Sequence, residues 1–162
     1  MKGFLNGVVK NMAIVEAGEL KPNGQEASGR WLLRGPLALI YAYVGFVHVR
    51  SPQFFLPIVP DWVPEPNLVV LITGACEMAG AVALLTSRFR VFAGVMLALY
   101  AVCVYPANIK HALDDIAVGG SHLTWWYHGP RLAFQPVFVW WALYAGAVID
   151  WPFKRRRGII GG

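Results

Sequence analysis

The chain has 162 residues, of which 57% are hydrophobic and only 14% are charged, and its mean hydropathy is +0.50. Soluble domains carry about 25% charged residues, so the composition excludes an ordinary water-soluble protein. The net charge of +5 does not indicate nucleic-acid binding, because the basic residues flank apolar segments, where anionic lipid headgroups attract them.

Residues 1–30 predict a cytoplasmic segment that precedes the main domain. Apolar residues recur at helical spacing from Phe4 to Ala13, as in an amphipathic helix lying on a membrane surface. A partly ordered tail is the alternative. The following stretch, "KPNGQEASG", is typical of a linker.

Four long intervals of the sequence carry almost no charge, and each is about as long as the roughly 20 residues that cross a bilayer. They predict transmembrane helices at about 32–50, 68–86, 91–109 and 132–150. We therefore expect an all-α, polytopic membrane protein, with a four-transmembrane-helix bundle over residues 31–153 and a basic cytoplasmic tail over 154–162.

The connection between the first two spans, "RSPQFFLPIVPDWVPEPN", contains five prolines, which exclude a simple helix. Its aromatic and aliphatic residues make it too apolar for a solvated loop. We expect this segment to dip into the outer membrane interface and to cover the bundle there.

Lysine and arginine are distributed unequally between the two sides of the predicted membrane. One side holds the N-terminal segment, the 87–90 turn and the tail "WPFKRRR", whereas the other holds only Arg50, Lys110 and Arg131. Cytoplasmic loops carry the excess of basic residues, so both termini are predicted to be cytoplasmic.

One carboxylate, Glu77, lies inside the apolar run "ITGACEMAGAVALL". An ionisable group at the centre of a bilayer costs on the order of 3 kcal/mol, so it is expected to face the interior of the bundle and to have a function. The other spans also carry polar residues toward their outer ends: Tyr41, His48, Tyr105, Asn108 and Gln135.

These positions predict a polar cavity in the outer half of the bundle, with Glu77 as its floor. Glu77 and His48 are the candidate catalytic residues, as proton acceptors. A purely structural role is the alternative, in which a neutral Glu77 bonds Gln135 or Asn108 and sets the helix register. The candidate cofactor-binding residues that line the cavity are Tyr41, Thr73, Tyr105, Asn108 and Gln135.

Cysteine and histidine spacing gives no further site. Cys76 and Cys103 lie at similar predicted depths, so a redox pair is conceivable, but no CxxC motif is present. The four histidines show no HxxxH or HExxH spacing, and no metal site is predicted.

Four stretches together resemble the DoxX family of bacterial membrane proteins: "GFVHVRSPQFFLPIVPDWVPEP", "ITGACEMAGAVALLTSRFR", "VYPANIKHAL" and "PRLAFQPVFVWWAL". The resemblance covers residues 31 to about 150. It implies a four-helix bundle in the bacterial inner membrane. The family takes its name from a subunit of a quinone-coupled oxidising system, and other members look like accessory partners of oxidoreductases.

The function predicted from these features is a redox-associated membrane subunit that holds a quinone or quinol. If it is an enzyme, it is a subunit of a quinone-linked oxidoreductase. No motif for haem, flavin or iron–sulfur ligation is present, so electrons would pass to a protein partner. The alternatives are a non-catalytic assembly or scaffold subunit and a proton-coupled small-molecule transporter that works as a homo-oligomer.

Overall fold

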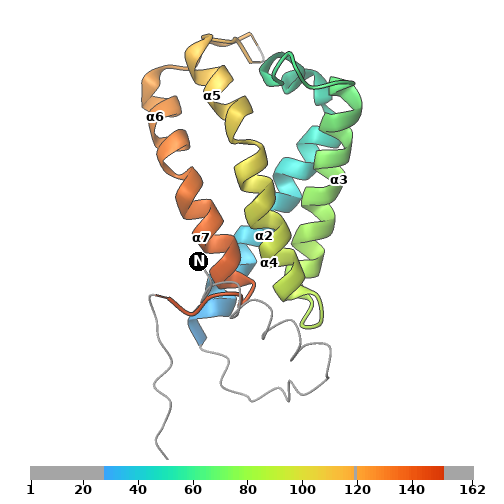
Figure 1. The fold of residues 1–162 in the computed structure, drawn as a ribbon, viewed down its shortest axis with the longest axis vertical. Helices are drawn as coiled ribbons and strands as arrows, with labels where there is room; N and C mark the ends of the chain where they lie inside the picture. The colour runs from blue at the N-terminus through green and yellow to red at the C-terminus, as the bar shows by residue number, and fades with distance from the viewer. Residues whose placement is uncertain (1–27, 119, 152–162) are drawn as a thin grey trace, which may run out of the picture.

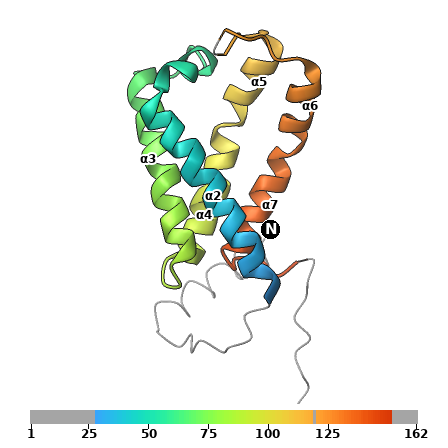
Figure 2. The same cartoon turned by 180° about the vertical axis from the view of Figure 1, so that it is seen from behind.

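The computed structural model describes residues 28–118 and 120–151, and these form an all-α bundle (Figures 1 and 2). The predicted N-terminal amphipathic helix and the basic tail lie outside the described residues. The helices are α2 (Ser28–Arg50), α3 (Pro66–Leu85), α4 (Arg90–Cys103), α5 (Tyr105–Leu113), α6 (Trp125–Ala133) and α7 (Gln135–Ala145), with two short 3₁₀ helices, η1 (Pro52–Phe54) and η2 (Leu56–Ile58).

Within the described part of the chain, three helical segments are long and apolar enough to cross a membrane: Arg30–Arg50, Pro66–Leu85 and Arg90–Leu113. They correspond to the first three predicted spans and confirm a polytopic helical membrane protein. The third segment consists of α4 and α5, which are separated at Val104. Pro106 explains the break, because a proline has no N–H to donate to the carbonyl four residues earlier.

The predicted fourth span is not one continuous helix. It is divided at Phe134 into α6 and α7, and Pro136 again removes a backbone donor at the junction. α7 ends at Ala145, earlier than the predicted residue 150. Ala147 has a positive φ of 61°, and the N–H of Val148 bonds the carbonyl of Leu143, which closes the helix end.

Glycines bring the helices close together in two places, since small residues let helix backbones approach each other. A Cβ atom on Gly45 of α2 would lie 2.6 Å from the carbonyl oxygen of Gly74 in α3. A Cβ on Gly146 would lie 2.6 Å from the Cα of Gly94 in α4. The buried core extends through Leu37, Tyr41, Ala81, Leu84, Leu97, Ala98, Ala142 and Ala145.

The bundle has two different ends. At the terminal end, the start of α2, the 86–89 turn and the end of α7 lie together; at the loop end, residues 51–65 and 114–124 connect the helices (Figures 1 and 2). At the loop end α3 and α6 lie on opposite sides of the bundle in both views, so the helices diverge there.

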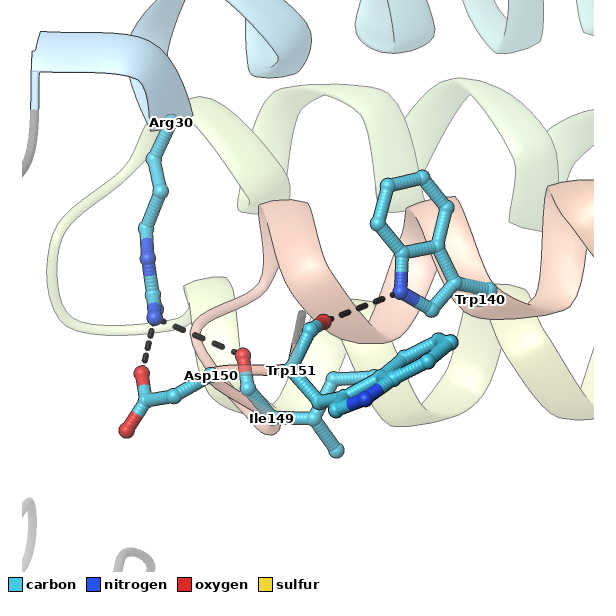
Figure 3. Close-up of polar contacts among 5 residues, drawn as sticks. All are labelled: Arg30, Trp140, Ile149, Asp150 and Trp151. Carbon is cyan, nitrogen blue, oxygen red and sulfur yellow. Dashed lines mark hydrogen bonds and ion pairs between the residues drawn. The ribbon is translucent and has the colours of Figure 1, made fainter. Parts of the chain in front are cut away.

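Polar contacts tie the terminal end together. Arg30 forms an ion pair with Asp150 after α7, and Trp140 Nε1 donates to the carbonyl of Trp151 at 3.1 Å (Figure 3). Arg34, one turn further along α2, is buried, and its Nε donates to the carbonyl of Ala145 at 3.0 Å. The terminal half of the bundle therefore holds a buried cation among its apolar residues.

Candidate functional site

A cavity of about 470 Å³ occupies the loop half of the bundle. Its walls are mainly aliphatic and aromatic, and its polar side chains come from several helices. Residues 55–63 of the proline-rich connection contribute Phe55, Ile58 and Trp62 to the lining. The prediction that this connection covers the bundle is confirmed, because it lines the cavity at the loop end.

Glu77 and His48 meet where α2 and α3 cross. Glu77 is only 3% exposed, and its Oε2 lies 3.1 Å from His48 Nδ1. The same Nδ1 lies 2.9 Å from the carbonyl oxygen of Val44, which can only accept, so Nδ1 carries a proton. The Nδ1 proton points to the Val44 carbonyl. Glu77 Oε2 therefore lies within ion-pair distance of the His48 ring but makes no well-angled hydrogen bond within the described chain.

Aromatic rings surround this pair. The His48 ring stacks on Phe55 with centroids 3.7 Å apart, which links the proline-rich connection to the floor of the cavity. Tyr41 and Tyr100 lie close enough to the Glu77 carboxylate to interact with its charge. Their rings pack edge to face, with centroids 6.1 Å apart. The floor therefore combines an acid, an imidazole and two phenols in an otherwise apolar cavity.

The cavity brings together most of the residues that the sequence analysis selected. Thr73 lines it, but the Thr73 hydroxyl donates to the carbonyl of Val70 in its own helix at 2.9 Å. Tyr105 does not line the cavity. The selected residues on the lining are Tyr41, His48, Thr73, Glu77, Asn108 and Gln135.

Asn108 and Gln135 form a separate polar contact, nearer the loop end. Asn108 Nδ2 donates to Gln135 Oε1 at 3.1 Å, and Gln135 Nε2 donates to the carbonyl of Ala101. Neither amide bonds Glu77, so the predicted alternative in which Glu77 bonds Gln135 or Asn108 is not found. Because Gln135 uses both ends of its amide within the bundle, this contact joins α5 and α7.

Three residues of the lining that the sequence analysis did not select are of particular interest: Tyr100, Arg131 and Phe55. Tyr100 lies eight residues before Asn108, two helical turns away on the same face, and this spacing was the available signal. Arg131 lies one turn before Gln135 but was interpreted only as a flanking charge. Phe55 was expected in the covering segment, but its stacking on His48 had no signal in the sequence.

Neither metal ligation nor a disulfide is seen in the described chain. It contains no group of three or more His, Cys, Asp or Glu side chains arranged to hold a metal ion. Cys76 and Cys103 are both exposed and are not bonded to each other. Only Cys103 lines the cavity.

Comparison with known proteins identifies a family but no characterised relative. No curated protein and no solved structure matches the chain. The DoxX resemblance is not supported, since the matching family model has a different name. That model, described as a domain of unknown function (DUF8561), matches residues 37–146, and the chain belongs to this family.

Proposed function

We propose that the protein is a membrane subunit that binds a quinone or quinol in the cavity between its helices. The observation that carries this proposal is the composition of the cavity floor, where the Glu77–His48 pair lies at the base of an apolar space. About 470 Å³ falls within the 300–1,000 Å³ of typical small-molecule sites. The apolar walls suit a lipid-soluble ring, and the phenol of Tyr100 offers a hydrogen bond to a ring oxygen.

The chemistry follows from the groups at the floor. Oxidation of a quinol breaks two O–H bonds and releases two protons and two electrons. The Glu77 carboxylate accepts one proton and the unprotonated Nε2 of His48 accepts the other. The electrons pass to a redox protein partner, such as a one-electron carrier that is reduced twice.

We assign the quinone ring to the Glu77 end of the cavity. Tyr100 and Asn108 are eight residues apart, or about 12 Å of helix, so one ring cannot contact both ends of the cavity. The Asn108–Gln135 contact is already satisfied within the bundle. Tyr100 is therefore the proposed hydrogen-bond donor, because the Tyr41 hydroxyl already donates to the carbonyl of Leu97 at 3.4 Å. Tyr41, Asn108 and Gln135 support the helices around the site.

Orientation is part of the same proposal. The terminal end, with Arg30, Arg34, Arg88 and Arg90, carries more basic residues than the loop end, so we assign it to the cytoplasm. The Glu77 site then opens toward the outer face of a bacterial inner membrane. Reporter fusions at the 86–89 turn and at the 114–124 connection test this assignment, with a cytoplasmic signal expected only from the first.

Native mass spectrometry of the protein extracted from its own membranes tests the quinone proposal. A quinone mass is expected on the wild type and on Glu65→Gln, a control that makes the same chemical change at an exposed acid. Glu77→Gln keeps the shape of the floor but accepts no proton, and it is expected to lose the quinone. A wild type without quinone, or equal retention by Glu77→Gln, would contradict the proposal.

A scaffold subunit is the second candidate, favoured by the close helix contacts at Gly45–Gly74 and Gly94–Gly146. It predicts that Glu77→Gln leaves the assembly of a partner complex unchanged, whereas a bulky residue at Gly74 abolishes it. A protein partner bound stoichiometrically, together with an empty cavity, would favour this candidate over quinone binding.

A further inference from the structure

A second cavity, of about 230 Å³, lies at the loop end beside the first. The 51–65 connection forms one side of it, and α5 and α6 form others. Arg131, Phe55 and Ile58 line both cavities, so they form the wall between them. This second space is distinct from the Glu77 floor.

The polar part of the second cavity is built around Arg131. The Arg131 Nη1 atom lies 2.8 Å from His111 Nδ1, and the guanidinium lies over the Tyr127 ring, 5.8 Å from its centroid. A guanidinium only donates, so His111 Nδ1 accepts, and the neutral His111 ring carries its proton on Nε2. His111 is 3% exposed, and its Nε2 makes no well-angled hydrogen bond among residues 28–118 and 120–151, although the ring lies beside the backbone of Ile116.

The charge of Arg131 has no acidic partner in the described chain. The acids nearest along the sequence are already paired, Asp114 with Lys110 and Asp115 with His122. The Tyr127 contact is close to the limit of about 6 Å for a cation–π interaction and compensates the charge only weakly. A half-buried cation beside an unused N–H donor is the arrangement that an anion completes.

We propose that the second cavity binds the phosphate group of an anionic amphiphile, with the guanidinium of Arg131 and the Nε2–H of His111 as donors. The rest of the lining selects an apolar body, because Val47, Phe54 and Leu123 surround the polar group. A free phosphate ion leaves these apolar walls unused. The proposal does not depend on what occupies the Glu77 cavity.

The test is native mass spectrometry of the full chain in a non-ionic detergent with added phosphatidylglycerol. Phosphatidylcholine with the same acyl chains is the comparison, since its headgroup has no net charge. The wild type is expected to retain phosphatidylglycerol preferentially. Arg131→Gln is expected to bind it about tenfold more weakly, as for the loss of one charge-assisted hydrogen bond. Arg50→Gln is the matched control, an exposed arginine at the same end, and is expected to bind like the wild type.

A second variant keeps the test valid if Arg131→Gln does not fold. Leu123→Trp fills the cavity without changing a charge, and it is also expected to lose the lipid. Equal binding of both lipids by the wild type, or unchanged binding by the folded variants, would overturn the proposal. Inorganic phosphate that displaces the lipid at millimolar concentration in an Arg131-dependent way would overturn the assignment to an amphiphile and indicate a free-phosphate site.

Discussion

The imidazole of His48 lies 3.1 Å from the carboxylate of Glu77, between two helices that are held close by glycines. Glu77 is buried and His48 is half-buried, and each lies in a segment long and apolar enough to cross a membrane. An acid at this depth is costly unless it is paired or neutral. The two side chains are therefore expected to depend on each other for stability.

A double-mutant cycle measures that dependence. His48→Ala leaves a buried carboxylate without its partner, and we predict a loss of about 1 to 3 kcal/mol in the free energy of unfolding. Once Glu77→Gln has removed the charge, the same His48→Ala change is expected to cost less. Unfolding in detergent micelles, followed by circular dichroism, gives both values. Strictly additive effects would show that the two groups do not interact.

The helix contact that positions this pair makes a separate prediction. Gly45→Ala is expected to destabilise the bundle by about 1 to 3 kcal/mol, because its Cβ would lie 2.6 Å from a backbone oxygen that cannot move aside. Gly35→Ala, in the same helix, is the control, since nothing lies within 4 Å of its Cβ. Thermal unfolding of the two variants side by side distinguishes them. Similar melting temperatures would mean that α2 and α3 are not closely packed at Gly45.

Sequence patterns predicted the helices better than the breaks within them. Hydropathy sums composition over a window, so it located the apolar spans but not the single missing N–H of Pro136 that separates α6 from α7. The break at Val104 was likewise not predicted. Tyr105 follows Tyr100 by five residues, about 140° around a helix of 3.6 residues per turn, and only Tyr100 lines the cavity.

Residues of the candidate site were predictable where their side-chain chemistry differs from that of the neighbouring sequence. Glu77 stands out in an apolar run, and His48 lies on the polar face of its own helix. Arg131 does not stand out, because an arginine at the end of a predicted span is common. Its proposed role depends on the absence of a nearby acid among the described residues in three dimensions, which sequence spacing does not report.

Two arginines one turn apart on α2 are predicted to contribute unequally to stability. Arg30 pairs with Asp150, whose side chain is 61% exposed. Arg30→Gln is therefore expected to lower the free energy of unfolding by less than about 1 kcal/mol. The stability of this variant is expected to be insensitive to salt, because the ion pair that salt screens is gone. Arg34 is buried and donates to the carbonyl of Ala145, the last residue of α7, so Arg34→Gln is expected to cost about 1.5 to 3 kcal/mol. Chemical unfolding at low and at high salt compares them. A larger loss for Arg30→Gln would contradict this order.

Cysteine modification provides a direct measure of occupancy in the first cavity. Cys103 lines the cavity and Cys76 does not, although both are exposed and free, so one chain contains both the probe and its control. With a short-chain ubiquinone analogue at ten times its Kd, only about one tenth of the protein is unoccupied. Alkylation of Cys103 by a membrane-permeant maleimide is then expected to slow about tenfold, with Cys76 unaffected. Peptide mass spectrometry over a time course gives both rates. Glu77→Gln is expected to remove the protection at Cys103, and protection that persists in this variant would place the ring away from the Glu77–His48 pair.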